Sequence, residues 1–397
     1  MIEREDLIAP IRPFYKVMDM VKIITGLRRS GKSVLMDQVA EEIRKTTINV
    51  NIIKMNFELF EFAKIRTAEQ LNEYIMANIT KDKENYVFFD EIQNVKEFEL
   101  VVNSLRARGN VSVFITGSNA HLLSSDLATN LAGRYVEFRI TPLTFKESLE
   151  LSNFKTTEQA FQDYLKWGGL PGRFIYNEEE EIERYLQSVY DSVVLRDIVY
   201  RSKLRDLDLL DDIIQFMLDN IGHIFSGNKI INYIKSNSRK ISPETLYNYI
   251  KVIVNSLVMQ KVNRYDIRGK NVFSTLEKYY IADLGLLQLK HSKIEENLTG
   301  RLENLVANQL TAKGWNINVG VLPKAEVDFV AEKSGERRYV QVAYVLDSQK
   351  AVDREFGAFK AIDDNYPKYV ITTDKIKQSQ SGIKHLNIID WLLSDKF

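Results

Sequence analysis

The chain has 397 residues, a length at which one hydrophobic core no longer suffices, so we expect two or three domains. Lysine plus arginine and aspartate plus glutamate both number 54, which excludes a global field that would mark the whole molecule as a binder of nucleic acid or membranes. The absence of cysteine excludes disulfides, a thiolate nucleophile and a cysteine-based zinc site.

Neither a membrane span nor a secretion signal is predicted. No apolar run approaches the roughly 18 residues of a spanning helix. The first ten residues, MIEREDLIAP, carry acids where a secretory signal has a basic and then an apolar region. We therefore expect a cytoplasmic protein that does not contact a membrane.

The first 140 residues alternate short β-rich runs with segments whose apolar residues recur every three or four positions. Such alternation predicts an α/β fold, a parallel sheet with helices on both faces. The expected strands are Val21–Thr25, Asn51–Phe57, Tyr86–Asp90, Val111–Thr116 and Tyr135–Ile140.

The rest of the chain changes pattern twice. Residues 143–204 are mostly helical, with one break at WGGLPGR. Residues 205–285 hold three helical patterns, the third opened by Ser242 and Pro243, and then a strand–turn–strand, which is the layout of a winged helix. Residues 286–397 combine one helix with the strands NINVGV, EVDFVAE, RYVQVAYVL and KYVITT, and predict a small mixed α/β module.

A phosphate-binding loop is predicted after the first strand. GLRRSGKS fits G-x-x-x-x-G-K-[ST], and a strand precedes it and a helix follows, as the mechanism requires. The two glycines let the backbone N–H groups face a phosphate, and the helix adds the positive end of its dipole. We expect Lys32 to bridge the β- and γ-phosphates of ATP and Ser33 to bind Mg²⁺. The expected nucleotide contacts are Gly26, Leu27, Arg28, Arg29, Ser30, Gly31, Lys32, Ser33 and Val34.

The strand YVFFDEIQ brings two acids to the same sheet edge. Asp90 is expected to hold Mg²⁺ through water, and Glu91 to polarise the attacking water, a pairing that favours ATP hydrolysis. After the fourth strand, Ser118 or Asn119 is expected to sense the γ-phosphate. Arg134 is a candidate arginine finger, with a surface salt bridge as the alternative.

Several motifs together resemble a known family. TGLRRSGKS, FFDEIQ, FITGSNAHLLS, LAGRYVEFRITPLTFKE and WGGLPG are similar to the bacterial and archaeal AAA-superfamily ATPases that carry a C-terminal DUF4143 domain. The resemblance implies an AAA-type P-loop core (1–142), a helical lid (143–204), a winged helix (205–285) and a C-terminal restriction-endonuclease-like, PD-(D/E)xK-like domain (286–397).

The predicted winged helix carries a local basic charge. Nine basic residues between 226 and 272 oppose two acids, for a local net charge of +7. Such a footprint favours double-stranded DNA, with Thr245, Asn248 and Lys251 facing a groove and Arg268 and Lys270 at the wing tip. The alternative is a winged helix that contacts a protein client.

The last module holds the outline of a nuclease site. Glu303, Asp328 and Gln341 match the acid positions of that pattern, but Ala343 stands where a lysine would orient water. Lys324 and Lys350 are the nearest replacements in sequence. We therefore expect a nuclease-like fold without catalysis.

The sequence thus predicts Mg²⁺-dependent ATP hydrolysis, coupled to a conformational change of a DNA- or protein-binding C-terminal half. Two alternatives stay open: an ATP-gated DNA nuclease, and a nucleotide-binding scaffold with little turnover. The oligomeric state is left open as well.

Overall fold

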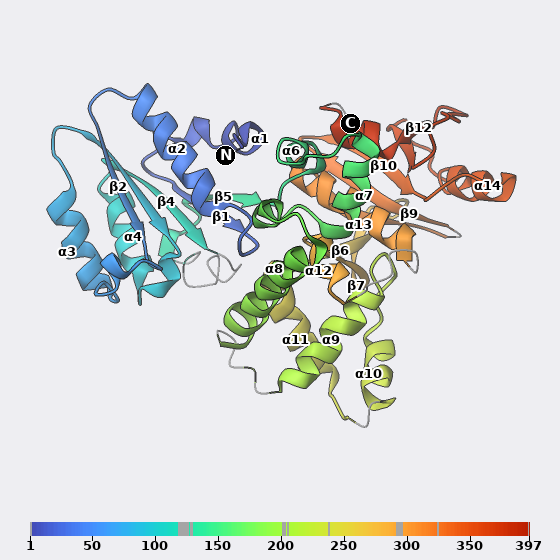
Figure 1. Cartoon of the computed structure of the whole chain (residues 1–397), viewed down its shortest axis with the longest axis horizontal. Helices are drawn as coiled ribbons and strands as arrows, with labels where there is room; N and C mark the ends of the chain where they lie inside the picture. Colours follow the sequence, from blue (N-terminus) through green and yellow to red (C-terminus); the bar gives the residue numbers. More distant parts are fainter. Residues whose placement is uncertain are drawn as a thin grey trace. The chain divides into compact units, whose positions relative to one another are not determined.

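The computed structural model describes residues 2–117, 127, 130–200, 204, 206–236, 239–290, 297–323, 325–395 and 397 (Figure 1). These residues form two compact units. Unit 1 comprises Met1–Ile140 and Asn255–Leu257, and unit 2 comprises Thr141–Val254 and Val258–Phe397.

Unit 1 is built on a five-stranded parallel sheet in the order β2-β3-β4-β1-β5. The predicted alternation of strands and helices is present, and β4 lies between β1 and β3, so the ends of these three strands are neighbours. The strands are β1 (Val21–Gly26), β2 (Val50–Asn56), β3 (Glu84–Asp90), β4 (Val111–Gly117) and β5 (Tyr135–Ile140).

Both faces of this sheet are buried, as a parallel sheet requires. Helix α2 (Lys32–Thr46) packs on one face, where the rings of Phe88 and Phe114 stack with centroids 4.6 Å apart. Helices α3 (Ala68–Asn78) and α4 (Phe98–Ala107) pack on the other face (Figure 1). The remaining helical turns of the unit are α1 (Glu5–Ile8), η1 (Arg12–Phe14), η2 (Phe60–Phe62) and η3 (Ile92–Asn94).

Unit 2 begins with helices where the sequence predicts a lid. They are α6 (Phe145–Leu149), α7 (Thr157–Trp167), η5 (Pro171–Ile175), α8 (Glu179–Ser192) and the π-helix η6 (Val193–Tyr200). Three more follow: α9 (Leu207–Asp219), α10 (Gly227–Ser236) and α11 (Pro243–Asn255), the last starting at Pro243 as predicted. The hairpin of β6 (Met259–Asp266) and β7 (Asn271–Ile281) comes next.

The hairpin belongs to a larger sheet. In the seven-stranded order β12-β11-β10-β9-β8-β6-β7, strand β6 pairs in parallel with β8 through Arg264–Val319, Tyr265–Gly320 and Asp266–Val321. The hairpin assigned to segment 205–285 and the strands assigned to 286–397 are therefore continuous. The other elements are α12 (Leu284–Gln288), α13 (Leu298–Ala312), β8 (Asn316–Leu322), β9 (Ala325–Lys333), β10 (Glu336–Val342), α14 (Gln349–Gly357), β11 (Lys368–Thr372), β12 (Lys384–Asn387) and α15 (Ile388–Leu393).

Strand β10 ends at Val342, four residues before the predicted end at Leu346. The side chain of Asp328 accepts the Val342 backbone N–H at 2.8 Å, so a carboxylate takes the place of a sheet hydrogen bond there. A local side-chain acceptor of this kind competes with the strand ladder and is invisible to a propensity pattern.

The WGGLPG and ADLG motifs meet at one buried carboxylate. Asp283 accepts hydrogen bonds from the backbone N–H of Gly169 at 2.7 Å and of Gly285 at 2.9 Å. A Cβ on Gly168 would lie 2.1 Å from Asp283 Oδ1, and one on Gly169 would lie 2.0 Å from the Leu143 carbonyl. Close approach therefore requires both glycines, Gly168 beside Asp283 and Gly169 beside the Leu143 carbonyl.

Within the described ranges of the chain, no helix is long and apolar enough to cross a membrane.

Candidate nucleotide site

The loop between β1 and α2 has the shape of a phosphate cradle. Gly31 adopts φ +100° with open space where a Cβ would lie, so its glycine is needed for conformation. Gly26 is needed for space, because a Cβ there would lie 2.6 Å from the Ile140 carbonyl. Ser30 is fully buried and its Oγ has no hydrogen-bond partner in the structure. A buried polar atom without a partner fits a loop that binds a polar ligand.

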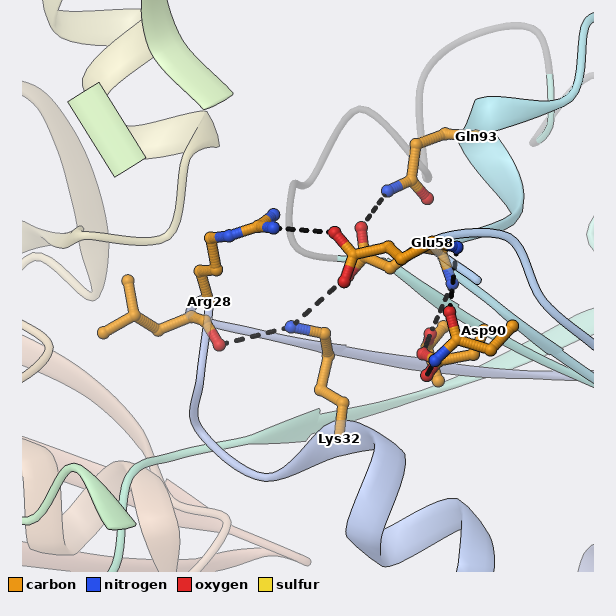
Figure 2. A network of polar contacts seen from close by, with 9 residues as sticks. Arg28, Lys32, Glu58, Asp90 and Gln93 are labelled. Carbon is orange, nitrogen blue, oxygen red and sulfur yellow. Dashed lines mark hydrogen bonds and ion pairs between the residues drawn. The ribbon is translucent and has the colours of Figure 1, made fainter. Parts of the chain in front are cut away.

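Lys32 points back over the loop. Its Nζ donates to the carbonyls of Gly26 at 3.1 Å and Leu27 at 3.2 Å, and it lies 3.9 Å from the Glu91 carboxylate. Figure 2 shows this ammonium between the loop and the acids at the strand ends. Only 5% of Lys32 is exposed, so its charge acts in a poorly screened environment.

The Asp90 carboxylate is oriented by two neighbouring strands. Thr116 on β4 donates its hydroxyl to Asp90 Oδ1, and Asn56 at the end of β2 donates its amide to Oδ2 at 3.1 Å. The same Thr116 oxygen accepts the backbone N–H of Glu91 at 3.1 Å. The sequence analysis did not identify Thr116 or Asn56. Asn56 is the last residue of β2 and Thr116 the last but one of β4, so a position near the carboxyl end of a strand, which identified Asp90, could have found them.

Ser33 and Asp90, the two expected Mg²⁺ ligands, line one cavity of about 230 Å³. Ser33 is the second residue of α2 and Asp90 the last of β3, so the parallel sheet brings an exposed hydroxyl and a carboxylate to one opening. Oxygen ligands of this kind suit a hard divalent cation. Lys54, Asn56 and Glu61 also line the cavity.

Glu91 is held in a demanding position. Its backbone φ is +54°, a left-handed conformation that a non-glycine residue adopts at a cost of about 1–2 kcal/mol. Burial raises the pKa of its carboxyl, with the charge of Lys32 acting in the opposite direction. A raised pKa brings a carboxylate closer to the range where it accepts a proton efficiently.

Two further contacts complete the network in Figure 2. The side-chain amide of Gln93 donates to Glu91 Oε2, and Arg28 in the loop pairs with Glu58 at 2.7 Å. Neither Gln93 nor Glu58 was predicted from sequence. Of the other residues expected to contact the nucleotide, Leu27 is buried, whereas Arg29 and Val34 are exposed.

The structure does not bring Arg134 to this site. Its backbone carbonyl accepts the N–H of Val21, so it lies beside the start of β1, whereas the loop follows the end of that strand. Its guanidinium lies 3.4 Å from Asp19 and is about half exposed. Within one chain Arg134 thus makes the surface salt bridge that was the alternative interpretation. Ser118 and Asn119 lie outside the described residues.

The basic residues between 226 and 272 are partly neutralised. Arg239 pairs with Asp206, Asp208 and Asp212, and Lys261 lies 3.5 Å from Glu277. The side chains predicted to face a groove or to lie at the tip are all exposed: Thr245, Asn248, Lys251, Arg268 and Lys270.

The predicted nuclease residues do converge. Glu303 on α13, Asp328 on β9 and Gln341 on β10 lie together in unit 2, with the Gln341 amide oxygen accepting the Asp328 backbone N–H at 3.3 Å. The lysine beside them is Lys278 on β7. Of the two nearest candidates in sequence, Lys350 is exposed on α14, and Lys324 lies outside the described residues.

Comparisons with known proteins agree with this geometry. The family model of an AAA domain, AAA_14, matches residues 19–149, and that of a domain of unknown function, DUF8612, matches residues 158–297. The DUF4143 assignment stays a resemblance. The Walker-type ATPase of Pyrococcus abyssi aligns with a TM-score of 0.51 at 16% identity, over 73% of this chain and 96% of that one, which shows a shared fold.

Two relatives match nearly the whole chain. An uncharacterized protein of Haemophilus influenzae is 37% identical over 99% of both chains. An uncharacterized protein of Methanocaldococcus jannaschii is 30% identical over 88% of this chain and 80% of its own. The chain therefore belongs to the family that these two relatives represent, and within it residues 19–149 match the model of an AAA domain.

Proposed function

We propose that this protein hydrolyses Mg·ATP, with Lys32 on the phosphates, Ser33 and Asp90 at the metal and Glu91 as general base. The observation that carries the proposal is the convergence of the loop, Lys32 and Glu91 at the carboxyl edge of the sheet, with Ser33 and Asp90 lining one cavity. Mg²⁺, when bound, would neutralise charge on the transferred phosphoryl group.

Lys32, Glu91 and Thr116 each have a separate proposed role that follows from their position. The ammonium of Lys32 donates to two loop carbonyls. When ATP binds, the γ-phosphate would replace these carbonyls as a charged, and therefore stronger, acceptor. Moving toward that phosphate takes Lys32 away from Glu91, which lies 3.9 Å away. The Glu91 carboxylate would then accept a proton from water, and Thr116 keeps its backbone in place.

Phosphate release and ATP binding test this proposal together. We expect wild type to release phosphate, Glu91→Gln to bind ATP with turnover reduced at least 100-fold, and Lys32→Ala to lose binding. Glu97→Gln, an exposed acid in the same segment, is the matched control and should behave as wild type. Tight ATP binding by wild type without turnover would instead favour the scaffold alternative.

We further propose that the C-terminal half binds double-stranded DNA through α10, α11 and the hairpin tip. Support comes from the exposed Lys229, Lys235 and Lys251 on the two helices and from Arg268 and Lys270 at the tip. Such side chains contact phosphates and release counterions, so affinity should fall steeply with salt.

Charge reversal at the tip tests DNA binding. Arg268→Glu with Lys270→Glu should weaken binding and flatten the dependence of log affinity on log salt by about two ions. Lys81→Glu with Lys83→Glu is the control, since it makes the same change of charge at two exposed lysines in unit 1. Equal loss in both double variants would contradict a site at the tip.

A protein client is the second candidate for the same region. Three apolar side chains of β7 favour it: Val272, Phe273 and Leu276 are 58%, 39% and 43% exposed. If DNA does not bind at low salt, replacing these three residues with serine should abolish capture of a client. We propose that a conformational change of the helical lid couples ATP hydrolysis to the binding of either partner.

A further inference from the structure

A buried lysine lies among three carboxylates where β7, α13 and β9 meet. Lys278 is 2% exposed. Its Nζ lies 2.9 Å from Glu303 Oε1, 2.8 Å from Glu326 Oε1 and 3.7 Å from Asp328 Oδ1. The ammonium has three donors, and the three acids approach it from a helix and a strand far apart in sequence.

Two of these acids also have other partners. The Tyr280 hydroxyl, two residues along the same face of β7, donates to Glu303 Oε1. The Val342 backbone N–H donates to Asp328 Oδ2. Asp328 and Glu303 are 7% and 5% exposed. Glu303 and Asp328 are thus held within the protein by more than Lys278, whereas the Glu326 side chain is 31% exposed.

The electrostatics show which cation balances this set. Burial, followed by the charge of Glu303, raises the pKa of Asp328 well above its ordinary value, and Lys278 opposes that rise. Burial alone would lower the pKa of Lys278, but the charges of Glu303, Asp328 and Glu326 raise it instead. The lysine is therefore charged at neutral pH.

We propose that Lys278 is a built-in cation that occupies the place of a divalent metal in this acid set, making the set a structural lock and not a nuclease site. The lock joins the hairpin strand β7 to α13 and β9.

Access and ligand supply both support this assignment. A phosphodiester must touch the metal and the lysine of a nuclease site, whereas Lys278, Glu303 and Asp328 are all at least nine-tenths buried. Here the ammonium lies at hydrogen-bond distance from two of the acids, where a metal ion would need to be.

Two successive residues of α13 bind β7 at this lock. While Glu303 receives Lys278 and Tyr280, Asn304 accepts the Ile281 backbone N–H at 2.7 Å and donates to its carbonyl at 2.9 Å. Removing one partner of a buried charge pair leaves the other charges uncompensated. The hairpin should therefore depend on Lys278 for its attachment.

Thermal melts of the full chain without nucleotide, with and without Mn²⁺, test the proposal. Lys278→Ala should lower the melting temperature by roughly 5–15 °C in metal-free buffer, because three carboxylates are left without a cation. Added Mn²⁺ should restore several degrees in this variant alone, since the vacated position offers it oxygen ligands. Lys360→Ala, at an exposed lysine of the same unit, should match wild type in both buffers.

Three results would overturn the assignment. One is a wild-type melting temperature that rises with Mn²⁺ and no longer does so in Asp328→Asn. Another is Mn²⁺-dependent DNA cleavage by wild type that Asp328→Asn abolishes. The third is a Lys278→Ala variant that Mn²⁺ does not stabilise. The first two use wild type and a conservative variant, so they decide the question even if Lys278→Ala does not fold.

Discussion

The side-chain amide of Gln93 donates a hydrogen bond to the carboxylate of Glu91, two residues earlier in the chain. Glu91 directly follows β3 and Gln93 lies in the turn η3, so the contact forms within one sharp change of chain direction. The Nζ of Lys32 lies 3.9 Å from the other carboxylate oxygen, Glu91 Oε1, so the proposed base lies between an amide and an ammonium (Figure 2).

Gln93→Ala should reduce ATP turnover by about 10-fold and move the acid limb of the pH–rate profile to higher pH. An amide donor favours the ionised carboxylate, so losing it raises the pKa of Glu91 further. Phosphate release measured from pH 5 to 8 checks this, with Asn94→Ala as the control in the same turn. An unchanged acid limb would show that Gln93 does not position the base.

The wild-type rate should rise with pH through a pKa above the ordinary 4.5 of a glutamate. Burial disfavours the charged form of Glu91, and only the ionised carboxylate accepts a proton from water. The corresponding limb should be missing from the residual rate of Glu91→Gln. A limb retained by that variant would assign the titration to another group.

Gly31→Ala and Gly109→Ala should cost similar stability but differ in nucleotide binding. Both glycines have positive φ, +100° and +72°, with nothing near the position of an added Cβ, so each substitution strains the backbone by about 1–2 kcal/mol. Only Gly31 belongs to the phosphate loop, so only its variant should lose ATP affinity. Denaturant titration and nucleotide binding separate the two effects, and equal affinity loss would refute the cradle.

Asp283 should make unit 2 less stable as pH rises from 4 to 6. Burial raises the pKa of this carboxyl to about 6 from 3.8, even though the N–H groups of Gly169 and Gly285 lower it. The native state therefore binds the proton more tightly than the unfolded state. The resulting stability is fully present below pH 3.8 and is lost as pH rises through 6, for a difference of about 3 kcal/mol.

Comparing the free energy of unfolding of wild type and Asp283→Asn across this range isolates the group. The difference between the two proteins should change with pH in that direction. A constant difference would mean that the hydrogen bonds, and not burial, dominate at Asp283.

Local patterns carried much of the candidate site. The glycines and Lys32 follow a strand and open a helix within eight residues, and Asp90 and Glu91 end another strand, so spacing alone predicted them. Thr116, Asn56 and Gln93 were missed, because their roles depend on which strand end or turn faces Asp90 and Glu91. Arg134 was named as a candidate arginine finger from its position in the chain, whereas its backbone contact with Val21 puts it beside the start of β1.

The sequence by itself determined the alternating α/β core, the phosphate loop and the acid pair, because helix and strand periods and loop chemistry act over a few residues. Only the tertiary structure decided that the hairpin β6–β7 joins the C-terminal sheet, since strand pairing across some fifty residues leaves no local pattern. It alone also placed Lys278 among Glu303, Glu326 and Asp328. The nuclease pattern has a lysine two residues after Gln341, where this chain has Ala343. The lysine beside the acids comes instead from β7, a pairing that only the folded chain shows.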